Sequence, residues 1–325
     1  MKTKSLLMMS VTIGIIAALT ASGCRKKDKK DEEQPDTNYT YVNDHNLAES
    51  YNNDVGNIGS EAGETGSVNN YRLENGNSVF GIESAPCATV TLDLSAKQFT
   101  VDFGSTLCLC KDGRYRSGKL IYNYSASTNG AVWPRQPGYS ITCTSQNYLV
   151  SNTSSPADAY TVNIINRTHT NTTPPGFNPS TTNITWTVSA NIQVIKPASA
   201  GGGTISWNSN RTIELMNTND PTVYDPSGNL PIAWNKVKLK INGSTNGTTA
   251  NGIAYNVTLS NLIWDTQCTP DPLRPFRHPF TSGTITFKPS GKPDRVIDFG
   301  YGGGCDFLAQ VCIPAYNFCA NITLP

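Results

Sequence analysis

Charged residues are scarce in this sequence. Asp, Glu, Lys and Arg make up 15% of its 325 residues, whereas an average soluble domain has roughly 25%. Ser, Thr, Asn and Gly take their place, which is typical of exported β-rich proteins whose solvent faces carry hydroxyl and amide groups. The formal net charge is +1, so nothing in the charge balance indicates a nucleic-acid partner.

Motifs of several common catalytic chemistries are also missing. The sequence contains no G-x-S-x-G, no H-E-x-x-H and no G-x-x-x-x-G-K-[ST], which removes the usual signatures of serine hydrolases, zinc hydrolases and phosphate-binding loops. The only three histidines are far apart, in no metal-ligand spacing. We therefore predict a non-enzymatic protein without a metal site or cofactor. Glycoside hydrolysis needs only two carboxylates from distant strands, and the strand-region acids to test are Asp102, Glu214 and Asp298.

Long apolar runs are confined to the N-terminus. Lys2 and Lys4 precede an uncharged apolar stretch over 6–21, and three small residues, Ala21-Ser22-Gly23, follow directly before Cys24. This order is typical of a secretory signal, and the run is too short for a comfortable membrane span. Elsewhere no apolar run approaches 18 residues, so we expect no other membrane-spanning segment.

Cys24 and the small residues before it resemble a bacterial lipobox, although position 21 is Ala rather than the usual Leu. The resemblance implies that residues 1–23 are a lipoprotein signal peptide and that Cys24 is acylated. Two or more acyl chains anchor a protein stably in a bilayer. We therefore expect the lipid bilayer to be the partner of Cys24. The alternative is an ordinary signal peptide followed by an incidental cysteine.

Nine consecutive charged residues, 25–33, follow this cysteine. Such a run cannot bury apolar area, so residues 24–43 are predicted to form a disordered tether with a mean reach of about 25 Å. It is either a solvated spacer or a sorting signal. A cluster of this kind resembles the signals that send Bacteroidetes-type lipoproteins to the outer face of the outer membrane.

Eight cysteines remain once Cys24 is set aside for lipidation. An even number in an exported chain indicates disulfides rather than a zinc site, because no second C-x-x-C and no nearby histidine accompany them. Their number allows 105 connectivities, so no pairs are assigned. The candidates are Cys87, Cys108, Cys110, Cys143, Cys268, Cys305, Cys312 and Cys319.

One amphipathic helix is predicted over 44–62, with Asn43-Asp44 as its N-cap and a narrow apolar stripe made by Leu47, Tyr51, Val55 and Ile58. The narrow stripe suggests that the helix packs on the outside of a larger body. Gly56 and Gly59 weaken the prediction, because glycine disfavours the interior of a helix.

The period of the apolar residues changes to two from about residue 85. Residues 184–194 alternate strictly, and after Gly201-Gly202-Gly203 the alternation continues to 215, which predicts an antiparallel hairpin with one buried face. A second hairpin is predicted over 236–263 around an Asn251-Gly252 turn, with a bulge near Ser260-Asn261. We expect about a dozen strands in one all-β domain over 85–325, mostly an antiparallel meander, forming a large sandwich or an elongated rolled sheet.

A faint internal repeat lies at the two ends of this region. Thr89-Val-Thr-Leu is followed by Asp102-Phe-Gly, and Thr284-Ile-Thr-Phe is followed by Asp298-Phe-Gly. The two copies predict equivalent strand-turn-strand units that flank the sheet or pair across it. Chance similarity among Thr-rich hairpins is the alternative.

The charge run after Cys24, the single helix and the Cys-rich β region together resemble an uncharacterised group of Bacteroidetes-type lipoproteins. The matching segments are Val101–Arg114, Gly203–Arg211 and Gly291–Gly300. The resemblance implies a protein anchored in the outer membrane and exposed on the cell surface, and it brings no known activity.

Two functions stay open. The first is a non-enzymatic surface lipoprotein that binds an envelope protein or supports the envelope. The second is a polysaccharide-binding protein or glycoside hydrolase, whose ligand would contact aromatic and cationic loop residues. A sheet with only Thr, Asn and Ser on its open face would favour the first, and paired carboxylates beside exposed aromatics the second. The loop candidates are Trp133, Arg274, Phe276, Arg277 and His278.

Overall fold

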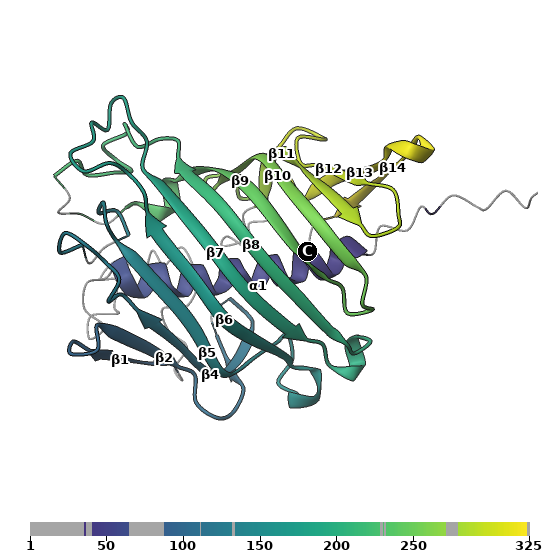
Figure 1. Cartoon of the computed structure of the whole chain (residues 1–325), viewed down its shortest axis with the longest axis horizontal. Coiled ribbons are helices and arrows are strands. Elements are labelled where there is room, and N and C mark those ends of the chain that lie inside the picture. Colours follow the sequence, from purple (N-terminus) through teal and green to yellow (C-terminus); the bar gives the residue numbers. More distant parts are fainter. Residues whose placement is uncertain are drawn as a thin grey trace, which may run out of the picture. The chain divides into compact units, whose positions relative to one another are not determined.

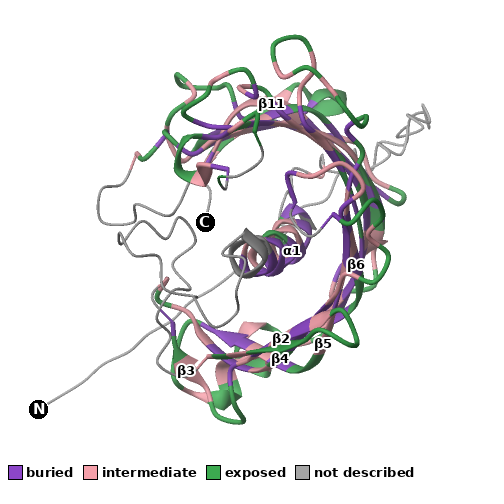
Figure 2. Cartoon of the chain, turned by 90° about the vertical axis from the view of Figure 1, so that its left-hand side faces the viewer, coloured by how far each residue is buried: buried purple, intermediate pink, exposed green. Residues whose placement is uncertain are grey.

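A single long helix lies inside a rolled antiparallel sheet. The computed structural model describes residues 36, 41–64, 88–110, 112–131, 134–227, 230, 232–270 and 279–323. Within the compact unit Asp36–Pro325, helix α1 (Tyr41–Glu64) runs through the hollow of the sheet (Figures 1 and 2). The predicted helix is confirmed, but its placement on the outside of the body was wrong.

In the described residues fourteen strands form one sheet. Each strand pairs with its neighbour along the chain, except that β2 pairs with β4 and β3 lies off this path and pairs only with β4. Every pairing is antiparallel, so the predicted meander is confirmed. The strands are β1 (Thr89–Asp93), β2 (Gln98–Asp102), β3 (Cys108–Leu109), β4 (Tyr115–Asn123), β5 (Ser140–Ser151), β6 (Tyr160–Asn171), β7 (Thr185–Ile195), β8 (Thr204–Leu215), β9 (Lys238–Thr248), β10 (Ala254–Asp265), β11 (Phe280–Pro289), β12 (Arg295–Asp298), β13 (Leu308–Ile313) and β14 (Phe318–Thr323).

The sheet curls around the helix without closing. Among the described residues no pairing joins β1 to β14, which lie at the two ends of the strand order. The concave face carries most of the buried apolar residues of the strands and meets the helix, while the convex face meets solvent (Figure 2). Of the two expected architectures, the rolled sheet is therefore the one that forms.

Both hairpins predicted from the alternation are present. β7 and β8 pair over their whole length on either side of the glycine-rich turn, and Trp186 and Trp207 are buried in the core. β9 and β10 pair around the Asn251-Gly252 turn. Their register shifts between Leu259 and Leu262, which confirms the bulge expected near Ser260-Asn261.

The internal repeat is a repeat of structure as well as of sequence. In the β1–β2 hairpin Thr89 pairs with Asp102, and in the β11–β12 hairpin Thr284 pairs with Asp298. Each aspartate accepts a hydrogen bond from the backbone N–H of the glycine two residues later. Each intervening phenylalanine is buried and donates its own N–H to the carbonyl of a glycine, Gly118 or Gly283. The two units lie toward opposite ends of the strand order.

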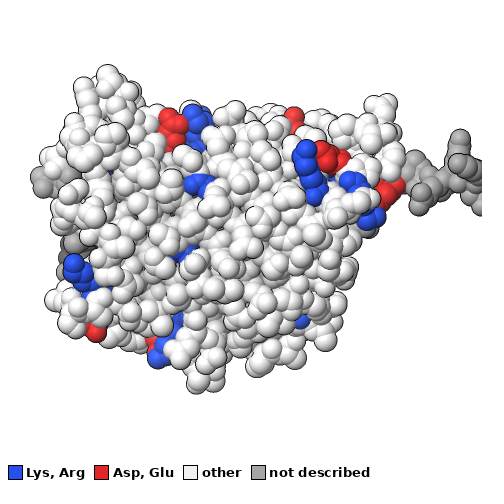
Figure 3. Space-filling view, viewed as in Figure 1, with Lys and Arg blue, Asp and Glu red and all other residues white. Residues whose placement is uncertain are grey.

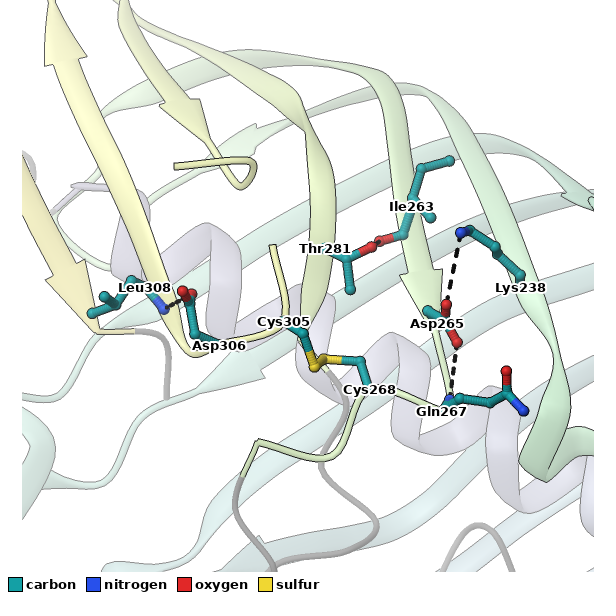
Figure 4. The surroundings of a disulfide bond; sticks show 9 residues. All are labelled: Lys238, Ile263, Asp265, Gln267, Cys268, Thr281, Cys305, Asp306 and Leu308. Carbon is teal, nitrogen blue, oxygen red and sulfur yellow. Dashed lines mark hydrogen bonds and ion pairs between the residues drawn. A yellow bond between two sulfur atoms is a disulfide. The ribbon is translucent and has the colours of Figure 1, made fainter. Parts of the chain in front are cut away.

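Disulfides are present in the C-terminal part of the sheet. Cys268–Cys305 ties the segment after β10 to the segment before β13, with a Cα–Cα distance of 5.5 Å (Figure 4). Cys312–Cys319 links β13 to β14 across a directly paired position. Cys108 is disulfide-bonded too, and Cys87 lies outside the described residues.

The prediction that all eight cysteines are paired was wrong for Cys110 and Cys143, which are buried free thiols. Cys110 sits beside Arg114 at the start of β4, and Cys143 pairs with Tyr122 near the end of that strand. At about 3.3 Å per residue the eight positions from Arg114 to Tyr122 place the two roughly 25 Å apart, whereas a disulfide needs Cα atoms within about 7 Å.

Two helix glycines are explained by close contacts with the sheet. A Cβ on Gly56 would lie 2.3 Å from the Arg167 guanidinium, and a Cβ on Gly59 would lie 2.4 Å from the Tyr122 ring. The Tyr122 hydroxyl also donates a hydrogen bond of 2.8 Å to the carbonyl of Val55. Glycine is thus used here to bring the helix close to the sheet, at the expense of helix propensity.

Replacing Gly59 with alanine is expected to lower the free energy of unfolding by about 1–3 kcal/mol, because the Tyr122 ring is buried and cannot yield without strain. Denaturant unfolding followed by tryptophan fluorescence measures this. Asn57→Ala, on the same turn of the helix, is the matched control and should be neutral or slightly stabilising. A G59A protein as stable as the parent would contradict the close contact.

Candidate binding surface

The convex face of the sheet is covered by hydroxyl and amide side chains. Over β6–β10 the outward positions are almost all Thr, Ser, Asn and Gln, and charged groups gather toward the ends of the strands. Figure 3 views this face and shows few charges on it. The alternation of buried and exposed residues along each strand produces this surface, because successive side chains point to opposite faces.

One row of this surface consists of asparagines alone. Cross-strand pairing places one asparagine from each of five neighbouring strands, β6 to β10, side by side. We call this set the asparagine row; its members are, in order, Asn166, Asn191, Asn208, Asn246 and Asn256. Neighbouring strands are about 4.8 Å apart, so the row extends about 19 Å around the curve of the sheet.

The amides of this row are available to a ligand. In the described part of the chain, none of the five side chains hydrogen-bonds to another protein group, and each is exposed or half-buried. An asparagine side chain offers two N–H donors and one carbonyl acceptor. The row therefore presents ten donors and five acceptor oxygens, in register, to whatever lies on the sheet.

Some side chains in the neighbouring rows hydrogen-bond to each other. The Ser206 and Thr248 hydroxyls are 2.8 Å apart, and the Asn163 amide donates to the Gln193 carbonyl oxygen at 3.4 Å. On the other side, the hydroxyls of Thr142 and Thr168 are 3.0 Å apart. What sets the asparagine row apart is that all five positions carry an unpaired amide, whereas the rows beside it mix hydroxyl and amide groups, some of which bond to each other.

A β-bulge ends the row on β6. The pairing of β6 with β7 shifts between Ile164 and Asn166, and the extra residue, Ile165, is 56% exposed next to the first asparagine. Ser145 on β5 fills the gap behind the bulge, because its hydroxyl donates to the Val162 carbonyl and accepts the Ile164 N–H. An apolar side chain is thereby placed at one end of the polar row.

Charge is concentrated inside the roll. Carboxylates of α1 pair with basic side chains of the concave face: Asp44 with Lys196 at 3.1 Å and Glu49 with Arg211 at 2.5 Å. Asp54 pairs with Arg116 at 2.7 Å, and that guanidinium is fully buried. Buried charges persist only when paired and hydrogen-bonded. These pairs serve the packing of the helix, and they leave the convex face nearly uncharged.

Two further residues hydrogen-bond to buried arginines: Asn52 to Arg167, and Asp112 to Arg116. The Asn52 oxygen accepts a hydrogen bond of 3.1 Å from Nε of Arg167. Both oxygens of Asp112 accept from the Arg116 guanidinium, at 2.8 and 2.6 Å. Arg116 is therefore held between two carboxylates, one from the helix and one from the turn before β4.

Two buried histidines lie on the concave side in their neutral form. Burial lowers the pKa of His45 to about 4, against the opposing effect of Glu49, and its Nδ1 accepts a hydrogen bond from the Trp207 indole at 3.2 Å. Burial and then the charge of Arg167 lower the pKa of His169 to about 3. Burial also raises the pKa of the Cys143 thiol to about 12, so this free cysteine is unreactive at neutral pH.

The three acids proposed for testing have structural partners. Asp102 pairs with Lys119 at 2.9 Å, and this contact and its backbone hydrogen bond lower its pKa. Glu214 pairs with Lys240 at 2.5 Å and accepts from Asn183. Asp298 caps its own turn, and it lies at the opposite end of the strand order from Asp102. Among the described contacts, none joins one of these acids to another.

The predicted loop and lipidation residues cannot be placed. Cys24, Trp133, Arg274, Phe276, Arg277 and His278 all lie outside the described residues. Pro134, next to one of them, has a structural role: its carbonyl accepts hydrogen bonds from the Trp186 indole and the Asn171 amide, both at 2.8 Å.

Sequence reasoning missed both the asparagine row and the internal charge pairs. The pairs left a usable signal, because Arg211 falls on the same parity as Ile205 and Trp207, where an apolar residue is expected. The asparagine row left none, since it depends on the register of four successive strand pairings, which alternation within each strand does not determine. Among the described residues, no group of three His, Cys, Asp or Glu could hold a metal ion.

Comparisons of the chain with protein-family models, curated protein sequences and solved structures find no match.

The buried histidines predict a loss of stability in mild acid. Their folded-state pKa values lie below the unfolded value of 6.5, so unfolding takes up protons as the pH falls below 6.5. Their contribution is complete above pH 6.5 and declines toward pH 4. His45 alone accounts for on the order of 3 kcal/mol at 1.36 kcal/mol per pKa unit.

His45→Asn tests this contribution, because the asparagine oxygen can still accept the hydrogen bond from Trp207. We expect the slope of unfolding free energy against pH to fall by about half between pH 6 and 4.5, as one proton is taken up instead of two. Urea unfolding at a series of pH values gives the slope. An unchanged slope would contradict the burial of a neutral His45.

Proposed function

We propose that this chain is a lipid-anchored protein of the bacterial cell envelope, displayed on the outer membrane, that acts by binding or structural support rather than by catalysis. Acylated Cys24 holds it on the bilayer, and residues 25–40 link this anchor to α1 and the rolled sheet. The tether was expected to reach residue 43, but residues 41–43 belong to α1. The proposal of a non-catalytic role rests on the convex face of β6–β10, where almost all outward side chains end in hydroxyl or amide groups.

The chemistry of the described residues supports this proposal. The acids proposed for testing each have a basic or backbone partner, and none of the described contacts joins two of them. The carboxylates of the helix neutralise two buried arginines and the half-buried Lys196. The disulfides Cys268–Cys305 and Cys312–Cys319 fit an oxidising compartment such as the periplasm or the cell surface. None of the described helices is long and apolar enough to cross a membrane.

A polysaccharide-binding role is the second candidate. The asparagine row favours it, because its unpaired amides are the kind of group that hydrogen-bonds to sugar hydroxyls. A hydrolase finds no such support, since none of the described contacts joins two of the acids.

Replacing Cys24 with serine tests the anchor. The full-length C24S chain is expected to move from the membrane fraction to the soluble fraction and to lose labelling by a radioactive fatty acid, because no acyl group holds it on the bilayer. Ser22→Ala keeps a small residue before the cysteine and is the matched control, which should remain in the membrane. A C24S protein that stays membrane-bound without an acyl group would overturn the lipid anchor.

Replacing Asp31, Glu32 and Glu33 with alanine tests display on the surface. If the charge run is a sorting signal, the variant should stay acylated but become inaccessible to a protease added to intact cells. If it is only a spacer, protease digestion of the variant and the parent will match, and surface sorting by these acids is then excluded. A variant with three lysines changed, Lys26, Lys27 and Lys29, separates the effect of the acids from that of charge density.

A further inference from the structure

We infer that the asparagine row is a binding site for a neutral polysaccharide, whose chain lies across the strands on the convex face of the sheet. This deepens the second candidate function and rests on display of the sheet at the cell surface. The site lies on the face of β6–β10, whereas the sequence directed attention to the loops around Trp133 and residues 274–278.

Unsatisfied hydrogen-bonding capacity is the first argument. The five amides are in register from one strand to the next, and in the described part of the chain none of them hydrogen-bonds to another protein group. Each sugar hydroxyl is both donor and acceptor, and each asparagine side chain also offers both functions. A row of such amides therefore complements a hydroxyl-rich chain along its whole length.

The lack of charge is the second argument. A charged polymer would need basic or acidic side chains along its path, and the asparagine row has neither. The next residue in line, Lys288 on β11, is already paired with Asp294 at 3.1 Å. Charge complementarity thus favours an uncharged ligand.

The curvature of the sheet is the third argument, and it separates the polysaccharide from other occupants. The row runs around the convex side of the roll (Figure 2), so a second copy of this face could touch it only along a narrow line. A flat crystalline lattice would meet it in the same limited way. A peptide would pair with an exposed sheet edge rather than a face. A polymer chain can follow the curve and use all five amides.

Ile165 gives the row an apolar end. Its side chain is 56% exposed because the bulge turns it outward beside Asn166. Sugar rings carry C–H faces as well as hydroxyls, so an apolar contact at one end of a line of amides suits a sugar ring. An exposed isoleucine gains free energy from any such contact that removes it from water.

Affinity electrophoresis of the full-length chain in detergent tests the inference. The gels contain laminarin, mannan or xylan as neutral polymers, and polygalacturonate or dextran sulfate as charged ones. We expect at least one neutral polymer to retard the chain, with retardation insensitive to salt because no ion pairs are involved. Failure of all three neutral polymers to retard it, or stronger retardation by a charged one, would overturn the inference.

The site itself is tested by the triple variant Asn191→Thr, Asn208→Thr, Asn246→Thr. Threonine favours strands, so the sheet should keep its thermal unfolding midpoint while three adjacent amides are removed. We expect binding to weaken by roughly tenfold or more, since several modest hydrogen bonds are lost together. Unchanged binding would exclude the asparagine row as the site.

A matched control changes the next row on the same three strands: Ser189→Thr, Asn210→Thr, Ser244→Thr. It introduces the same residue at the same number of positions and should bind like the parent. Equal weakening in both triples would overturn the assignment to the asparagine row. Self-association of the parent that only the asparagine triple abolishes would instead identify a second copy as the occupant. The binding measurements do not depend on acylation of Cys24. Their outcome is therefore independent of the outcome of the anchoring test.

Discussion

The fold depends on pairing between one polar-faced helix and basic side chains that point inward from the sheet. Arg116, Arg167 and Arg211 come from β4, β6 and β8, and each meets a polar side chain of α1. Replacing such a pair with apolar residues often costs a protein nothing, but removing one partner alone is strongly destabilising. The pairs therefore fix which turn of the helix faces which strand, and the apolar contacts supply the stability.

This constraint explains why the sheet rolls and does not form a sandwich. A sheet with one apolar face must cover it, and a second sheet or a curl around another element would do so. Here the helix fills the hollow, and its glycines let the Tyr122 ring and the Arg167 guanidinium approach the helix backbone. A sandwich would leave the carboxylates of the helix and the inward arginines without partners.

Much of this arrangement could be predicted from local patterns in the sequence. The hairpins around Gly201–Gly203 and Asn251-Gly252, the bulge after Leu259 and the burial of Trp186 and Trp207 all follow from alternation and turn residues within a few positions. The helix was also predictable, but its position was not. Its apolar stripe is narrow because polar residues on the neighbouring face are buried too, and they pair with residues 60 to 160 positions away.

The cysteines show the same limit. The even number of cysteines and the expected oxidising compartment predict disulfides. Whether a given pair forms depends on which cysteines the strand register brings to a Cα–Cα distance within about 7 Å. Cys312 and Cys319 flank a tight turn and pair directly, whereas Cys110 and Cys143 are separated by most of the length of β4. The asparagine row is harder still to predict, since the register of five strands must be known before its residues can be aligned.

The two faces of the sheet divide the polar residues by a single physical rule. On the concave face charge is tolerated because each charged group meets an opposite charge or a hydrogen-bond partner in a confined space. On the convex face uncharged groups suffice, because water satisfies them at little cost. Water on the asparagine row can be displaced by any ligand that returns its hydrogen bonds. A surface of amides without ion pairs therefore discriminates by hydrogen-bond pattern and shape, and this is the property that recognition of an uncharged polymer requires.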